Sequence, residues 1–175
     1  FDTLFNSKLK DKIDINLTSP ILAAGINDSL FLCQKLFDMK GINLNSNKKE
    51  LPIDPRYIKE FDLSGINIMN VISTFDSPEF LAKIIKSGIF DCNEKTDPSY
   101  DFEINGTPLI IALKNKRFDN FDLILNHYKD KLDLKLTDRE GKSVVDYCKE
   151  FPIQQEGLLQ KLHEIDESID ISFLL

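Results

Sequence analysis

The stretch GTPLIIA at residues 106–112 decides the fold. Thr107 can cap a helix with its side-chain hydroxyl, and Pro108 stands at the first helical position, where its missing N–H has no hydrogen bond to lose. Leu109 and Ala112 lie three residues apart, which places them on one face of that helix. We therefore predict a short helix that begins after Thr107 and buries Leu109 and Ala112 against its neighbours.

A second apolar helix is indicated by FDNFDLILNHY, residues 118–128. The same order of a polar cap, a short apolar helix and a longer apolar helix recurs three more times, with Ser19, Asn67 and Ser143 in the place of Thr107. The spacings between successive caps are 48, 40 and 36 residues. A helical unit that recurs in this way is typical of repeat proteins.

The apolar faces of these helices predict an all-α core, with strand limited to the turns between units. Phe37, Phe80 and Phe121 fall where the longer helices pack, and Gly88 is expected to end the helix that carries Phe80. Further residues expected to face inward are Leu81, Ile84, Ile85, Ile124, Leu125, Val144, Val145 and Cys148.

These copies resemble ankyrin repeats. GTPLIIA and SGIFDCN (residues 87–93) are the most specific pieces, and GKSVVDYC (residues 141–148) is similar to a common variant of the motif. The resemblance implies one domain, a helical repeat solenoid with short β-turn fingers over residues 1–175. Its expected parts are a truncated repeat at 1–17, repeats at about 18–64, 65–104 and 105–140, a capping repeat at 141–165 and a tail at 166–175.

The sequence departs from the ankyrin pattern at the histidine of the TPLH motif. Its place is taken by Leu22, Asn70, Ile110 and Asp146. The hydrogen bonds that this histidine makes between ankyrin repeats must therefore be missing or replaced. Two insertions, after Asn45 and after Asn93, lengthen the segments where ankyrin repeats carry their fingers. Insertions in repeat proteins commonly map to one face, often the binding face.

Composition limits the classes of partner. The chain has 22 basic and 29 acidic residues, a net charge of −7, and 42% apolar residues, so it can bury a core but shows no basic patch for nucleic acid. No apolar run approaches the roughly 20 residues that cross a bilayer, and the first residues lack a signal-peptide pattern. We expect a soluble, cytoplasmic, monomeric protein that binds neither nucleic acid nor membranes.

The cysteine and histidine positions do not indicate a disulfide framework or a zinc site, because these residues are few and widely spaced. They are Cys33, Cys92, Cys148, His127 and His163. Cys92 and His127 could be read as a thiol and its base, but no Gly-rich turn surrounds Cys92. We interpret Cys33 and Cys148 as core residues and expect Cys92, at the start of a finger, to react first with a thiol reagent.

Three aspartates could be read as a calcium or general-acid cluster: Asp130, Asp133 and Asp138. Their spacing lacks the glycine and the terminal glutamate of a calcium-binding loop, so we interpret them as solvated loop carboxylates. The sequence predicts no catalytic residue, no metal site and no cofactor.

The ankyrin resemblance also implies a partner-binding surface, formed by the ends of the first helices and by the finger tips. The helix-end residues are Ile26, Asn27, Thr74, Phe75, Lys114, Asn115, Glu150 and Phe151, and the last finger carries Arg139 and Lys142. In the insertions, Tyr57 and Tyr100 could cover a core edge or meet a ligand. Phe75 and Arg139 are expected to contribute most, because an exposed Phe among basic residues gives an apolar anchor with a polar rim.

The sequence thus predicts a protein–protein interaction module that binds a partner protein through its concave face and fingers. The chain begins with Phe1, and we expect it to be part of a longer protein. The alternative is a regulatory or substrate-recruiting domain packed on a catalytic domain of the same chain, as in an effector that a bacterium delivers into the host cytoplasm. A catalytic motif before Phe1 would favour that alternative.

Overall fold

The structure is a computed structural model that describes residues 29–38, 68–88, 90–96 and 105–172. The chain divides into two units, Phe1–Ser64 and Gly65–Leu175, whereas the sequence predicts a single domain. The dividing point coincides with the predicted boundary between the repeats at 18–64 and 65–104. The predicted truncated repeat and the helix after Ser19 lie outside the described residues.

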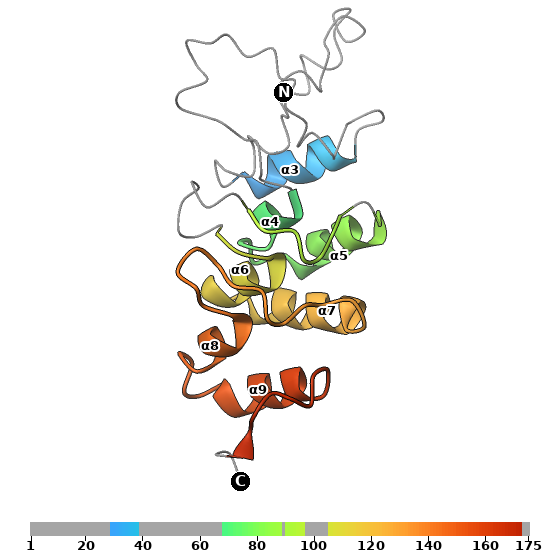
Figure 1. Ribbon diagram of the computed structural model, residues 1–175. Helices are drawn as coiled ribbons and strands as arrows, with labels where there is room; N and C mark the ends of the chain where they lie inside the picture. Colours follow the sequence, from blue (N-terminus) through green and yellow to red (C-terminus); the bar gives the residue numbers. More distant parts are fainter. Residues whose placement is uncertain (1–28, 39–67, 89, 97–104, 173–175) are drawn as a thin grey trace, which may run out of the picture. The chain divides into compact units, whose positions relative to one another are not determined.

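In the first unit, the described residues form helix α3, Leu30–Phe37 (Figure 1). Cys33 and Leu36, three residues apart on one face, are buried, whereas Phe31 is 68% exposed. Phe37 is half-buried, so the prediction that it lies in the core is wrong. It is the last residue of α3 and stands next to the exposed Asp38, so the end of the helix leaves part of its ring open to solvent.

The second unit is all-α in its described residues, with six helices that follow one another along the chain (Figure 1). They are α4 (Ile68–Ile72), α5 (Pro78–Lys86), α6 (Pro108–Lys114), α7 (Phe118–Tyr128), α8 (Val144–Cys148) and α9 (Gln155–His163). α4 packs on α5, α6 on α7 and α8 on α9; α6 also contacts α4 and α8, and α5 contacts α7. The isolated β-bridge recorded in this unit joins Thr137 and Ser143.

Local signals in the sequence begin and end these helices as predicted. The Thr107 hydroxyl accepts a hydrogen bond from the backbone N–H of Ile110 at 3.4 Å, with Pro108 as the first helical residue. Ser143 forms a capping box with Asp146, in which each side chain accepts from the backbone N–H of the other residue. Gly88 has a φ of +66° just after α5, the conformation in which glycine commonly follows a helix.

The core of the second unit consists of the apolar faces predicted from the sequence. Phe80 and Phe121 are almost fully buried, as are Leu109 and Ala112 of α6. The other predicted residues that are buried are Leu81, Ile84, Ile85, Ile124, Leu125, Val144 and Cys148. Val145 is only half-buried, and Tyr147 lies in the core of α8 in its place. Each large apolar side chain buried in this way contributes roughly 1.5–3 kcal/mol to stability.

One turn recurs after each longer helix. Asp91, Asp133 and Asp166 follow α5, α7 and α9, and the Oδ1 atom of each accepts a hydrogen bond from the backbone N–H two residues later. The distances are 2.8 Å to Asn93, 3.0 Å to Lys135 and 3.0 Å to Ser168. Such Asx turns fix the direction in which the chain leaves a helix. The three helix pairs therefore end in the same local geometry.

The base of the next loop is also built twice in the same way. Before α6, the backbone N–H of Thr96 donates to the Gly106 carbonyl, and the Gly106 N–H donates to Thr96 Oγ1. Before α8, the N–H of Asp138 donates to the Lys142 carbonyl, and the Lys142 N–H donates to Asp138 Oδ1. Gly106 has a φ of +127°, and a Cβ atom there would lie 2.9 Å from Ile110, so this closure requires glycine.

Polar side chains tie each helix pair to the next. Asn70 of α4 donates through Nδ2 to the carbonyls of Glu94 and Gly106 at 3.3 and 3.1 Å. In the other direction, Arg117 Nε donates to the Thr74 carbonyl at 2.7 Å, and Asn120 Nδ2 donates to the Phe75 carbonyl at 2.6 Å. Side chains of α4 and α7 thus supply hydrogen bonds between these two neighbouring helix pairs.

Candidate functional site

A buried ion pair lies beneath the loop between α7 and α8. Lys114, the last residue of α6, places its Nζ 3.3 Å from Asp138 Oδ2, and the Tyr147 hydroxyl donates to the same oxygen at 2.6 Å. The side chains of Lys114 and Asp138 are 3% and 0% exposed. Asp138 Oδ1 accepts from the backbone N–H groups of Glu140 and Lys142 at 2.9 and 3.1 Å. The carboxylate is therefore enclosed by donors from α6, α8 and its own loop.

This environment suits a structural ion pair rather than acid–base catalysis. Burial by itself would raise the pKa of Asp138, but the hydrogen bonds from Tyr147, from the two backbone N–H groups and from Lys114 outweigh it and lower that pKa. Burial, followed by the hydrogen bond to Asp138, raises the pKa of Tyr147. Neither group is tuned toward neutral pH, as proton transfer would require. The prediction that Asp138 is a solvated loop carboxylate is wrong.

Next to this ion pair, the two successive loops are joined at one edge, which we call the loop edge. The Arg139 N–H donates to Asn105 Oδ1 at 2.8 Å, and Lys95 Nζ donates to the Thr137 carbonyl at 3.1 Å. A cavity of about 50 Å³ lies among these residues, with room for little more than a water molecule. The buried Asn105 Nδ2 has no hydrogen-bond partner in the described part of the chain.

The structure places two predicted binding residues on the loop edge and removes another from the surface. Arg139 is exposed, and Lys142 forms a half-exposed ion pair with Glu150 at 2.6 Å. Lys114 was expected at an exposed helix end, but its side chain turns inward to Asp138, so that expectation is wrong. Asn115 is half-buried, and its Nδ2 donates to the Ile111 carbonyl of its own helix at 2.9 Å.

The predicted residues at the other helix ends lie partly inside. Thr74 and Phe75 are half-buried, and their carbonyls accept hydrogen bonds from α7, as described above. Phe151 is half-buried and packs edge-on against Phe118, with 5.6 Å between the ring centroids. Asn27, Tyr57 and Tyr100 lie outside the described residues, as does Ile26.

Cys92 and His127 line the same cavity, of about 310 Å³, between the loop after α5 and the end of α7. Burial, and secondly the nearby charge of Asp91, raises the pKa of the Cys92 thiol, which favours the unreactive protonated form. Cys92 is only 4% exposed, so the expectation that it is the accessible cysteine is wrong. It lines this cavity together with Tyr128 of α7.

We therefore expect all three cysteines to be protected in the folded protein. Cys33 and Cys148 are fully buried, and burial raises the pKa of each thiol to about 12. An aromatic disulfide reagent such as dithiobis(nitrobenzoate) should react slowly with Cys33, Cys92 and Cys148 in native protein and rapidly in urea. Mass spectrometry of peptides from partly labelled protein checks this; rapid native labelling of Cys92 alone would contradict its burial.

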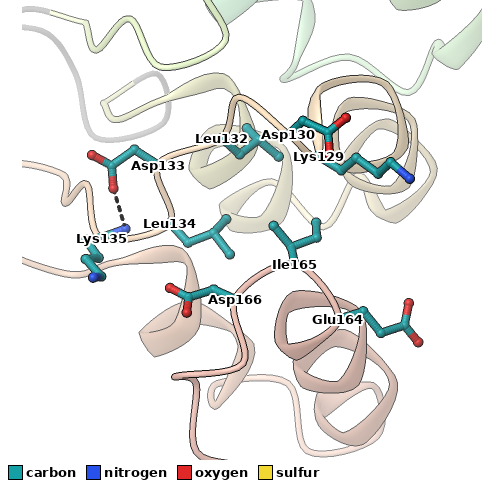
Figure 2. A pocket seen from close by; sticks show the side chains of 9 residues that line it. All are labelled: Lys129, Asp130, Leu132, Asp133, Leu134, Lys135, Glu164, Ile165 and Asp166. Carbon is teal, nitrogen blue, oxygen red and sulfur yellow. Dashed lines mark hydrogen bonds between the residues drawn. The ribbon is translucent and has the colours of Figure 1, made fainter.

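A cavity of about 650 Å³ lies between the loop after α7 and the end of α9 (Figure 2). We call it the α7–α9 groove. Leu132, Leu134 and Ile165 provide its apolar surface. Charged residues form the rest of its lining: Lys129, Asp130, Asp133, Lys135, Glu164 and Asp166. The sequence did not single out this groove, because Asp133 and Asp166 follow different helix pairs and only the packing of these pairs brings the two loops together.

Among the described residues, no group of three His, Cys, Asp or Glu side chains is arranged to hold a metal ion. No described helix is long and apolar enough to cross a bilayer. Comparison with known proteins gives no match to this chain, neither among protein-family models nor among curated proteins.

Proposed function

We propose that residues 65–175 form a stack of ankyrin-like repeats and that this chain is a protein–protein interaction module. The observation that supports the proposal most directly is the recurrence of the same Asx turn at Asp91, Asp133 and Asp166. Units with equivalent ends stack in register and present an extended surface instead of one enclosed active site.

The replacement at the ankyrin histidine supports the same architecture. In the position of that histidine, Asn70 donates to the carbonyls of Glu94 and Gly106, on the side of the following unit. We infer that the side chain at this position serves the same role between helix pairs with a different chemistry.

The chemistry of the described polar groups favours binding over catalysis. The buried Asp138 carboxylate has its oxygens occupied by Lys114, Tyr147 and backbone N–H groups, and the Cys92 thiol is held protonated. These groups stabilise the loops on which other side chains are exposed. We infer that the partner contacts Arg139 and Lys142 on the loop edge and Phe75 and Phe151 at the helix ends.

Removing Phe75 and Arg139 together is expected to weaken partner binding. Each truncation should cost about 1 kcal/mol or more of binding free energy, because a few anchors carry most of the energy of an interface. Phe75→Ala and Arg139→Ala both keep the backbone hydrogen bonds of the replaced residue. The melting temperature of Arg139→Ala should therefore change little. The measurement is affinity capture by the double variant and the wild type, followed by titration of the captured partner.

A matched control is Lys116→Ala, an exposed residue in the turn between α6 and α7. Undiminished binding by the double variant, with loss of binding after changes at Tyr57 or Tyr100, would move the site to the insertions. Cross-linking within full-length protein tests the alternative function, since a regulatory domain would link to a catalytic domain of its own chain.

A further inference from the structure

The α7–α9 groove lies at the junction of the loops after α7 and α9. This junction differs from the preceding one, between the loops after α5 and α7, in the residue at its bridging position. Between the loops after α5 and α7, Asn93 bridges the gap: its Nδ2 donates to the Lys131 carbonyl at 2.7 Å, and its Oδ1 accepts from the Asp133 N–H at 2.9 Å. Lys135 stands in the corresponding place of the next loop, two residues after the Asx-turn aspartate. A lysine side chain has no acceptor, so it cannot make both bonds of this bridge.

The two junctions differ in size accordingly. The cavity at the bridged junction has a volume of about 310 Å³, and the α7–α9 groove has about 650 Å³. The larger volume is within the range of sites that hold a ligand. Leu134 and Ile165 face one another across the middle of the groove, one from each loop (Figure 2). Ile165 is half-buried, which leaves part of an apolar side chain available for contact.

The rim of the groove carries four carboxylates and two lysines. Asp133 and Asp166 are held in place by their Asx turns, and Asp130 and Glu164 are exposed on the other side (Figure 2). This excess of negative charge disfavours phosphate groups, and it also disfavours a second copy of the same acidic surface, as a two-fold dimer would require. It favours a cationic ligand that also has an apolar part.

We propose that the α7–α9 groove binds an extended peptide segment of a partner protein in which an Arg or Lys stands beside an apolar side chain. The apolar side chain contacts Leu134 and Ile165, and the cation is attracted to the exposed carboxylates of the rim, Asp130 and Glu164. This surface is separate from the residues of the loop edge, so a partner engaged there by Arg139 does not have to occupy the groove.

The test uses a fluorescent peptide of alternating leucine and arginine, with a peptide of alternating leucine and glutamate as its counterpart. Fluorescence anisotropy with the full chain should show binding of the first peptide only. Charge reversal in the double variant Asp130→Lys, Glu164→Lys should weaken binding by about tenfold or more. The double variant Asp76→Lys, Asp119→Lys makes the same change in net charge at exposed positions outside the groove, and it should bind nearly as well as wild type.

A second variant separates loss of binding from loss of folding. Lys135→Asn should recreate the Asn93 bridge and narrow the groove, so peptide affinity should fall while the melting temperature stays the same or rises. Equal weakening by the groove and control reversals would show that only net charge attracts the peptide and would overturn the proposal, as would full affinity in Lys135→Asn. Arg139→Ala should leave peptide binding intact, so failure here is distinguishable from failure of the loop-edge function.

Discussion

Asp138→Ala is expected to lower the free energy of unfolding by about 3–5 kcal/mol, because it removes the carboxylate that pairs with the buried Lys114 ammonium. The substitution also removes the acceptor of the Tyr147 hydroxyl and of two backbone N–H groups. Urea denaturation followed by circular dichroism measures the loss. Asp130→Ala, at an exposed position in the same loop region, is the control and should change stability by about 0.5 kcal/mol or less.

The contribution of Asp138 to the free energy of unfolding should decrease as the pH falls. Because the pKa of Asp138 is lowered in the folded state, its contribution is present above the unfolded value of about 3.9 and is lost as the pH falls through the folded value. Asp138→Asn keeps an acceptor oxygen but removes the charge, so its stability deficit relative to wild type should shrink in acid. A deficit that stays constant from neutral to acidic pH would show that the charge of Asp138 does not matter.

Leu109→Ala should destabilise the protein by roughly 2–5 kcal/mol through the loss of buried methyl groups and the cavity left behind. Leu109 is 2% exposed and lies on α6, the helix that contacts α4, α7 and α8. The matched control is Leu123→Ala on the half-buried side of α7, which should cost clearly less. A urea midpoint for Leu109→Ala equal to that of the control would show that α6 does not bury this face.

The helix starts could be predicted from sequence because their causes are local. Thr107 and Ser143 accept hydrogen bonds from residues three positions later, so each cap depends only on a stretch of four residues. The periodic faces of α5 and α7 follow from the helical repeat alone, which explains why Phe80 and Phe121 are found in the core as predicted.

The candidate sites were less predictable because the residues that form each site are far apart in the sequence. Lys114 and Asp138 are 24 positions apart, and nothing near Lys114 shows that its ammonium turns inward. Cys92 follows an exposed aspartate and looks like a loop residue, yet the end of α7 closes over it. For both residues, the position in the helical pattern predicts the face on which the residue lies. It does not predict which of these faces the neighbouring helix pair covers.

One usable signal was missed. An apolar residue followed by Asp occurs after each longer helix, at Asp91, Asp133 and Asp166, and each carboxylate forms the same turn. Aligning the copies on these aspartates, as well as on the caps, would have placed the loops after α7 and α9 side by side. The α7–α9 groove, which needs both loops, would then have been predicted.

The bonds from Arg117 and Asn120 to the turn before α5 mean that the α4–α5 pair depends on α7 for donors to this turn. The carbonyls of Thr74 and Phe75 accept hydrogen bonds from side chains of α7, so the α4–α5 pair without α7 would lose these two bonds at its turn. The same bonds connect the turn that carries Phe75, a proposed binding residue, directly to α7. A partner that contacts the Phe75 turn therefore meets backbone carbonyls whose positions are already held by α7.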